Sequence, residues 1–481
     1  MIVSTQLPRI IQGGMGIAVS DWRLARAVAV AGELGVVSGT ALDTVLVRRL
    51  QDGDPGGHMR RAMERFPVPD VSATVLKRFF LSEGREPGAS YRLLPLYRQN
   101  VSLMRQQITM LAAFVEVMLA KEGHDGVVGI NLLTKIQMPT LPTLYGAMLA
   151  GVDVVLMGAG IPREIPGALD LMANHDVASI RLDVVGMPAG EIALLTFDPR
   201  AANPSADLPL RRPLFFPIVS AASLAQTLAR KSNGRVDGFV VEGPTAGGHN
   251  APPRGALRVD GDGEPIYGER DVVDLSAMRK IGLPFWIAGG AGSPAALKSA
   301  LREGATGVQI GTLFAYCDES GFTPEIRARV IDGALNDTLR IRTDVRASPT
   351  GYPFKIVVTE CDAAAPAPNS PTGARDRLCD LGYLREAVRN EKGTLEYRCA
   401  AEPVESFLSK GGAVEQTIDR QCLCNALCAS IGMPQQRVDG FVEPAVVTSG
   451  DDVKHLAHFL GSRTHYAASD VIAFLRSDLK A

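Results

Sequence analysis

Four glycine-rich segments, one of which ends in a histidine, hold the residues best suited to chemistry. The segments are Gln12–Gly16, Glu242–His249, Trp286–Gly292 and Gly307–Thr312. Because glycine has no side chain, it allows a backbone to approach a flat or charged ligand closely. Histidine is the residue type that most readily exchanges protons near neutral pH. The pattern predicts a bound cofactor with a catalytic imidazole, His249, beside it.

The last two segments are typical of a phosphate site. They accompany the apolar runs Pro284–Ala288 and Gly307–Ile310, which we expect to be the seventh and eighth strands of a barrel. The loops after these two strands are the usual phosphate site of such barrels. We therefore predict that the backbone N–H groups of Gly289, Gly290, Gly311 and Thr312 hold a dianion, helped by a helix N-terminus.

Eight short apolar runs alternate with helical stretches and must position these loops. They are Ile10–Gly13, Leu34–Ser38, Val127–Leu132, Val152–Met157, Leu214–Val219, Gly238–Glu242, Pro284–Ala288 and Gly307–Ile310. This alternation predicts an α/β fold, a closed TIM (β/α)8 barrel of parallel strands joined by helices. Asp21 is expected to cap the helix 22–31, and Gly32 to end it. The loops at the carboxyl ends of the strands form the active face of such a barrel.

The barrel is expected to carry additions. We predict a domain at 1–355 that contains a helical insertion at about 41–125, with a helical run Leu93–Lys121, and a smaller insertion at about 178–212. The smaller insertion holds two apolar stretches, Ser179–Val185 and Ile192–Phe197, that form a hairpin or extra strands. The segment Asp362–Arg375 has the composition of a surface linker. Residues 356–481 are predicted to be a C-terminal, mostly helical extension.

The composition argues against several classes of protein. The chain has 481 residues, with 50 Lys+Arg against 52 Asp+Glu and 6% aromatics, which gives no reason to expect a nucleic acid or an anionic membrane as partner. The most apolar region, Ile136–Pro162, is interrupted by prolines and glycines, so we expect a helix and a buried strand rather than a membrane span. No secretory signal is visible at Met1–Gly14, and we expect a cytoplasmic protein.

Other chemistry-bearing motifs are weak. The odd total of seven cysteines argues against a disulfide scaffold. Cys422, Cys424 and Cys428, with Cys379 and Cys399 upstream, lack the C-x-x-C pairs usual in metal sites. We expect buried, reduced thiols and no metal site. The G-x-x-x-x-G-K-[ST] loop and the His-Glu-x-x-His motif are absent, so neither that type of nucleotide hydrolysis nor that type of zinc chemistry is indicated.

Taken together, the four segments resemble the nitronate monooxygenase family, also called 2-nitropropane dioxygenase-like flavoproteins, to which flavin-dependent enoyl-acyl carrier protein reductases are related. The resemblance covers residues 8–50 and 126–355. It is most specific at Gln12–Gly16, Gly129–Leu132, Ala246–His249, Ala288–Gly290 and Gly307–Thr312. The resemblance implies an FMN-binding barrel. The segment Ala347–Phe354 also resembles a stretch that follows the barrel in this family and is expected near the flavin.

The resemblance implies a role for each matching residue. His249 would be the catalytic histidine above the flavin. The FMN would be bound by Gly14, Met15 and Gly16 against the ring, by Asn131 at its polar edge, by Ser220 at the ring or ribityl chain, by Ala246, Gly247 and Gly248 on its flank, and by Gly289, Gly290, Gln309, Gly311 and Thr312 around the ribityl and phosphate groups.

The implied function is that of an FMN-dependent oxidoreductase that oxidises nitronates or nitroalkanes with O2. The large additions are also typical of polyketide and polyunsaturated-fatty-acid enoyl reductases, so an enoyl-thioester reductase using NAD(P)H stays open. A non-catalytic barrel that binds a phosphate ligand or a protein is the third alternative. A dehydrogenase of the inosine-monophosphate type is disfavoured, because it would need a nucleophilic cysteine and none precedes Cys317. The expected partners are a small-molecule substrate and O2 or NAD(P)H, and a homo-oligomer is compatible with the sequence.

Overall fold

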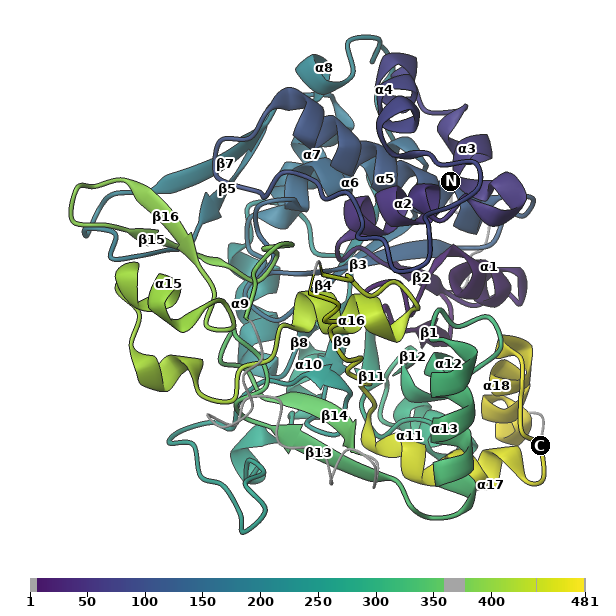
Figure 1. The fold of residues 1–481 in the computed structure, drawn as a ribbon. Helices are drawn as coiled ribbons and strands as arrows, with labels where there is room; N and C mark the ends of the chain where they lie inside the picture. Colours follow the sequence, from purple (N-terminus) through teal and green to yellow (C-terminus); the bar gives the residue numbers. More distant parts are fainter. Residues whose placement is uncertain (1–6, 359–376, 438, 480–481) are drawn as a thin grey trace.

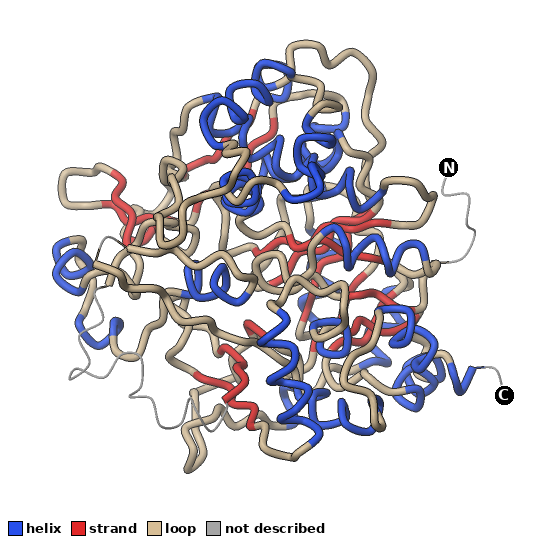
Figure 2. Tube along the Cα trace, turned by 45° about the vertical axis from the view of Figure 1, so that its right-hand side comes forward, coloured by secondary structure: helices blue, strands red, loops and turns tan. Residues whose placement is uncertain are grey.

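Eight parallel strands form a closed barrel at the centre of the molecule (Figures 1 and 2). The computed structural model describes residues 7–358, 377–437 and 439–479. The strands are β1 (Ile10–Gln12), β2 (Gly35–Ser38), β3 (Val128–Leu133), β4 (Val154–Gly158), β8 (Leu214–Val219), β9 (Phe239–Glu242), β11 (Phe285–Ala288) and β12 (Gly307–Ile310). Their order is β1-β12-β11-β9-β8-β4-β3-β2. A parallel bridge between Ile11 and Leu34 joins the last strand to the first. The predicted TIM barrel is confirmed.

Apolar side chains of alternate strand positions fill the barrel, as the period of a strand requires. A buried cluster of strand residues includes Ile11, Val36, Leu156, Phe216 and Trp286. The rings of Phe216 and Trp286 stack at 4.8 Å between centroids. This interior is packed solid, so a ligand must bind at one end of the barrel and not in its middle.

Helices cover the outside of the strands (Figure 2). They are α1 (Trp22–Val30), α6 (Thr140–Leu149), α7 (Ile165–Ala173), α9 (Ala222–Lys231), α10 (Leu275–Ile281), α11 (Pro294–Arg302), α12 (Thr312–Ala315) and α13 (Pro324–Leu335). The cap predicted for the first helix is present, since the carboxylate of Asp21 accepts from the N–H of Arg23 at 2.8 Å.

The first insertion is helical, as predicted. It contains α2 (Leu42–Gln51), η1 (Pro55–Gly57), α3 (His58–Met63), α4 (Pro69–Phe79) and α5 (Leu103–Lys121). The helical run predicted from Leu93 begins only at Leu103, because Pro95 is unsuited to a helix interior and Ser102 caps α5 by accepting from the N–H of Arg105 at 3.2 Å. By length and composition α5 is apolar enough to cross a membrane, but 78% of it is buried inside the protein.

The second insertion contains the predicted hairpin. Strands β5 (Ala178–Leu182) and β7 (Ala193–Phe197) pair antiparallel, with Ile180 opposite Leu195. The short strand β6 (Val184–Val185) pairs instead with a strand of the C-terminal extension. The one-turn helix α8 (Pro199–Ala202) follows the hairpin.

The described C-terminal residues contain several short helices joined by long loops, so they are less helical than predicted, and they also form a hairpin that the sequence analysis missed. The helices are α15 (Val404–Ser409), η3 (Val414–Thr417), α16 (Leu423–Ser430), η4 (Asp451–His455), α17 (Leu456–Leu460), α18 (Ala468–Leu475) and η5 (Ser477–Leu479). The hairpin consists of β15 (Glu386–Arg389) and β16 (Leu395–Arg398). The predicted linker at 362–375 lies outside the described residues. The division into domains at 355 and 356 stays a prediction.

A small sheet connects the barrel rim to the segment after the barrel. Strand β10 (Gly248–His249) pairs antiparallel with β14 (Phe354–Val358), which also pairs with β13 (Arg340–Asp344). His249 therefore faces Phe354 in the register of this sheet.

Contact between α5 and α6 gives a test of the packing around the barrel. A Cβ atom at Gly146 would lie 2.0 Å from the backbone oxygen of Met110, whereas one at Gly261 would have no neighbour within 4 Å. We expect Gly146→Ala to lower the free energy of unfolding by about 1–3 kcal/mol, because a backbone oxygen cannot move aside as easily as a side chain. That cost exceeds the gain in helix propensity, which is at most about 1 kcal/mol.

Urea unfolding followed by circular dichroism measures the effect. Gly261→Ala is the control, and a change within about 0.5 kcal/mol is expected for that variant. An unchanged or raised unfolding midpoint for Gly146→Ala would show that the two helices do not pack as described.

Candidate active site

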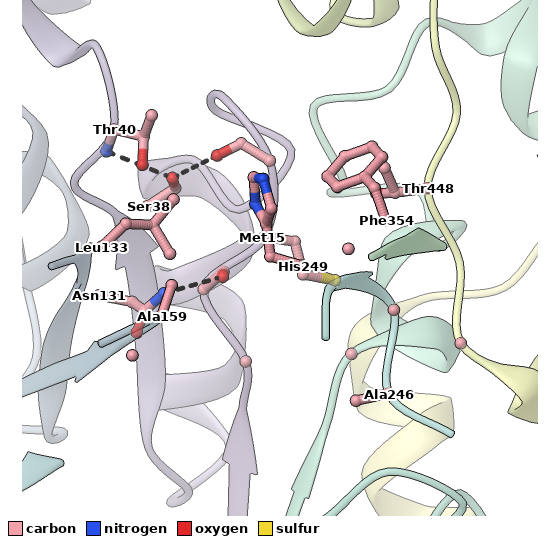
Figure 3. Close-up of a pocket in the computed structure, with 18 of the residues that line it drawn as sticks. Met15, Ser38, Thr40, Asn131, Leu133, Ala159, Ala246, His249, Phe354 and Thr448 are labelled. Carbon is pink, nitrogen blue, oxygen red and sulfur yellow. Dashed lines mark hydrogen bonds between the residues drawn. The ribbon is translucent and has the colours of Figure 1, made fainter. Parts of the chain in front are cut away.

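The predicted loops meet at the carboxyl-terminal rim of the barrel, around a cavity of about 200 Å³ that we call the rim cavity. Of the residues predicted to act in catalysis or cofactor binding, those that line it are Gly14, Met15, Gly16, Asn131, Ala246, Gly247, Gly248, His249, Gly289, Gln309, Gly311 and Thr312. Figure 3 shows several of these side chains around the same space. Residues from five different strand ends thus come together in one site.

Two predicted residues lie outside the lining. Ser220 borders a separate small pocket with Glu242 and Arg254, and its backbone oxygen accepts from the guanidinium of Arg254 at 2.8 Å. Gly290 lies next to the lining, and a Cβ atom there would be 3.2 Å from the hydroxyl oxygen of Thr245. The structure therefore gives Ser220 no contact with the rim cavity.

The glycines of the rim are required by the space around them. A Cβ atom at Gly14 would lie 2.4 Å from the Cβ of Asn131, and one at Gly289 would lie 2.9 Å from the backbone nitrogen of Ala246. Gly289 also has a φ of +84°, which L side chains rarely adopt. Larger residues at these two positions would push the loops of the rim apart.

The amide of Asn131 has an unpaired end at the rim cavity. Its nitrogen donates to the backbone oxygen of Gly14 at 3.2 Å, while its buried oxygen has no partner within the described part of the chain. Buried polar atoms in folded proteins are nearly always paired. The unpaired oxygen is therefore suited to accept a hydrogen bond from a bound ligand.

His249 presents a neutral imidazole at this site. Burial, together with the positive charge of Lys135, lowers the pKa of His249 to about 4. Its Nε2 atom lies 2.8 Å from the hydroxyl of Ser348, and its ring packs edge-on against Phe354 at 4.7 Å between centroids. Both neighbours lie in the segment predicted to lie near the flavin, and together they fix the orientation of the ring.

Glu242, at the end of β9, is a functional candidate to which the sequence analysis gave no role. It lines the rim cavity, and burial raises its pKa to about 7. A carboxyl group that is partly protonated at neutral pH can donate or accept a hydrogen bond. Its position in the Glu242–His249 segment was visible in the sequence, but its desolvation depends on the folded structure.

The N–H groups expected to hold a phosphate are partly available. Those of Gly289 and Gly290 have no hydrogen-bond acceptor among the described residues. The nearby N–H of Gly292, which was not among the predicted groups, donates to the carboxylate of Asp452 at 3.1 Å. Burial raises the pKa of Asp452, which lessens the negative charge that would oppose an anion. The helix expected to assist, α12, has only four residues, so its dipole contributes little.

The C-terminal residues cover the rim cavity, which no local sequence signal indicated. The cover, which we call the roof, consists of Tyr383, Leu384, Leu423, Cys424, Leu427, Thr448, Ser449, Gly450 and Asp452. Helix α16 supplies three of these residues and lies over the strand ends (Figure 1). The N–H of Gly450 donates to the hydroxyl of Thr312 at 3.0 Å, which ties the roof to the loop after β12.

No group of three or more His, Cys, Asp or Glu side chains is arranged to hold a metal ion in the parts of the chain that the structure describes. The rim cavity is lined mainly by glycines, apolar side chains, hydroxyls and amides, with His249, Glu242 and Asp452 among them. Such a lining suits a flat organic ligand with polar edges.

Fold and site together define the class of protein: a (β/α)8 barrel whose rim loops and C-terminal roof enclose a ligand cavity beside a neutral histidine. Residues 163–373 match the family model described as nitronate monooxygenase. The resemblance predicted from the sequence is thereby confirmed over these residues.

Comparison with individual proteins points to the same family. The chain is 32% identical over 121 residues to a probable nitronate monooxygenase of Bacillus subtilis strain 168, which is 25% of this chain. It spans about a third of the length of that curated relative.

The chain is also similar, at low identity, to several solved structures. FabK from Thermotoga maritima is 15% identical with a TM-score of 0.45, over 98% of this chain and 93% of that chain. A nitroalkane oxidase from Streptomyces ansochromogenes is 15% identical with a TM-score of 0.46, over 98% and 96%. The enoyl reductase domain of MlnA from Bacillus amyloliquefaciens is 10% identical with a TM-score of 0.45, over 99% and 97%. Because these TM-scores are low, we assign the barrel fold from the observed strand order alone.

The raised pKa of Glu242 predicts a pH-dependent stability. An unfolded glutamate titrates near pH 4.5, whereas Glu242 in the folded protein titrates at about 7. The stability contributed by Glu242 is thus fully present below pH 4.5, and it is lost as the pH rises through about 7. We compare the free energy of unfolding of Glu242→Gln with that of the native chain. We expect the advantage of the variant to be about 1–2 kcal/mol larger at pH 8 than at pH 5, a value reduced for partial exposure to the cavity.

Thermal unfolding of both proteins at pH 5 and pH 8 measures this difference. Glu269→Gln, which changes an exposed carboxylate on η2 (Glu269–Asp271), is the control and should show no such gain. A Glu242→Gln variant whose advantage is the same at both pH values would contradict a buried, partly protonated carboxyl group.

Proposed function

We propose that the rim cavity binds FMN and that the protein is an FMN-dependent oxidoreductase that oxidises nitronates with O2. The observation that carries the proposal is the neutral imidazole of His249 at the edge of a glycine-lined cavity. The family match over residues 163–373 supports an oxidoreductase of this type.

The residues present fit an FMN molecule. The turn Gly14–Gly16 and the flank Ala246–Gly248 line the rim cavity with residues that have small side chains or none, apart from Met15, so a flat ring could lie close to the backbone. The unpaired oxygen of Asn131 would accept from the N–H at the polar edge of the ring. The N–H groups of Gly289 and Gly290 would hold the phosphate.

When bound, FMN supplies the acceptor for substrate electrons and the reaction with O2. The protein supplies orientation, exclusion of water and one proton-exchanging group. The roof covers the cavity, and Met15 and Phe354 give it apolar walls. Within this site, the ring N–H of His249 would donate a hydrogen bond to an oxygen atom of the nitronate.

The low pKa of His249 favours a nitronate over a neutral nitroalkane as substrate. An imidazole with a pKa of about 4 is a weak base, and it is poorly suited to removing a proton from a carbon atom. A nitronate has already lost that proton. Its negative charge is also attracted by Lys135, the cation that lowers the pKa of His249.

A second candidate function, enoyl-thioester reduction with NAD(P)H, is favoured by a basic cavity next to the rim. This cavity of about 570 Å³ shares Ala159 with the rim cavity. Its charged lining consists of four cations, Lys135, Arg163, Arg181 and Lys231, and two carboxylates, Glu164 and Asp183, so cations are in excess. A phosphate-bearing arm or nucleotide would suit such a lining.

Among the described cysteines, Cys317, Cys379, Cys399, Cys424 and Cys428 form no disulfide, which is usual in a reducing compartment. On that ground we place the protein in the cytoplasm as part of the proposal.

Anaerobic mixing of the flavin-loaded protein with a nitronate, and separately with NAD(P)H, tests the proposal. We expect bleaching of the flavin absorbance by the nitronate without NAD(P)H. Rapid bleaching by NAD(P)H, with reoxidation by an enoyl thioester and none by nitronate, would establish the second candidate instead.

Replacement of the histidine tests its role in the same assay. His249→Ala should retain flavin and lose about 10²–10⁴-fold in kcat/KM, the usual contribution of a proton-exchanging group. His465→Ala, at an exposed histidine 3.2 Å from Asp318, is the control and should keep full activity. Unchanged turnover in His249→Ala would remove the imidazole from the mechanism.

A further inference from the structure

The C-terminal residues reach the end of the rim cavity that the sequence predicts to hold a phosphate. The segment 449–452 contacts the loops that follow β9 and β12. The N–H of Asp451 donates to the backbone oxygen of Thr245 at 3.0 Å, and the N–H of Gly450 donates to the hydroxyl of Thr312 at 3.0 Å. A Cβ atom at Gly450 would lie 2.9 Å from each of these two oxygen atoms, so the segment is packed tightly between the loops.

Asp452, the last residue of this segment, adds a contact to the loop after β11. Its carboxylate accepts a hydrogen bond from the N–H of Gly292 at 3.1 Å, two residues beyond Gly290. Asp452 is only 7% exposed, and it lines the rim cavity together with Gly289 and Thr312. Backbone N–H groups of such turns are the donors that bind phosphate in many proteins. The protein therefore places a carboxylate of its own beside the N–H groups predicted to bind a phosphate.

The carboxylate of Asp452 lacks the ion pair that its neighbour has. Among the described residues, no lysine or arginine pairs with Asp452, whereas Asp451 pairs with Lys355 at 2.8 Å. Burial is the largest influence on the pKa of Asp452 and raises it. A doubly charged phosphate beside the carboxylate would raise this pKa further, because adjacent negative charges oppose each other. We therefore expect the carboxyl group to be neutral when a phosphate is bound.

We propose that Asp452 is a cofactor-binding residue that holds the FMN phosphate through a protonated carboxyl group. The inference rests on the proposed function, because it takes FMN as the ligand of the rim cavity. One carboxyl oxygen accepts from the N–H of Gly292, and the O–H of the carboxyl group donates to a phosphate oxygen in a charge-assisted hydrogen bond. A carboxylate that is ionised in the flavin-free protein must take up a proton from solvent to do this. FMN binding is then coupled to the uptake of about one proton per chain.

Other titratable groups near Asp452 decide how a measured proton uptake is assigned. The titratable and charged groups on the elements around Asp452 are Asp451 and His455 of η4, His458 of α17, Lys355 of β14, and Glu242 and His249 of the rim cavity. Helix α12 contains none. His455 and His458 are exposed, and His249 has a pKa of about 4. Glu242, whose pKa is about 7, is therefore the competing source of a pH effect within the cavity.

Titration of the full-length, flavin-free protein with FMN at several pH values tests the proposal. Quenching of the flavin fluorescence gives the Kd, and the range from about pH 7 to pH 8.5 is suitable because the phosphate is then mostly doubly ionised in solution. We expect the Kd for FMN to rise by about tenfold per pH unit in this range, as the uptake of one proton requires. Riboflavin, which has no phosphate, should show little change in Kd over the same range.

Asp452→Asn is the decisive variant, because its amide imitates the protonated carboxyl group. The amide oxygen can accept from the N–H of Gly292, and the amide nitrogen is a permanent donor for the phosphate. We expect this variant to bind FMN about tenfold or more tightly than the native chain at pH 8.5, with a Kd that changes by less than about twofold from pH 7. Asp451→Asn is the matched control and should keep the native pH dependence, as should Glu242→Gln. Circular dichroism checks that each variant is folded.

Two results would overturn the proposal while FMN still binds. One is a pH dependence that Asp452→Asn leaves unchanged or that disappears in Glu242→Gln instead. The other is a native Kd for FMN that varies with pH no more than the Kd for riboflavin, a comparison that needs no variant. A protein that binds neither FMN nor riboflavin at any pH would overturn the proposed function as well, so the two failures are distinguishable.

Discussion

The closed parallel barrel is the constraint on which the rest of the structure depends. Because every strand runs in the same direction, every loop that follows a strand opens at one rim. Residues as distant in sequence as Gly14 and Gly311 are therefore neighbours in the rim cavity. The bridge between Ile11 and Leu34 closes the barrel, so a failure of this pairing would separate the first loop from the others.

The first insertion and the C-terminal residues contact each other next to the same rim. Tyr383 of the roof donates its hydroxyl hydrogen to Asp43 of the first insertion, and Asp43 pairs with Arg105 at 2.7 Å in a buried contact. The charge of Arg105 and these hydrogen bonds keep the pKa of Asp43 below its usual range although burial, the largest single influence, acts to raise it. A buried pair that lost one partner would leave an uncompensated charge. The hydroxyl of Tyr383 thus connects the C-terminal residues to a buried ion pair of the first insertion.

The sequence predicted the parts that local patterns encode. Eight apolar runs predicted the eight strands, and the glycine turns with His249 predicted residues that the fold brings to one rim. It failed where the deciding contact is distant in sequence. Ser220 was assigned by resemblance but lies against Arg254, and the roof with Tyr383 gave no local signal. The environment that shifts the pKa of Glu242 exists only after folding.

The central claim is that the rim holds FMN beside a neutral imidazole. The visible absorption spectrum of the purified protein, followed by mass spectrometry of the chromophore released on denaturation, tests it most directly. The account predicts a yellow protein that releases FMN, in an amount that falls when the unpaired oxygen of Asn131 is removed by Asn131→Leu. A colourless protein that takes up no flavin after incubation with FMN would contradict it.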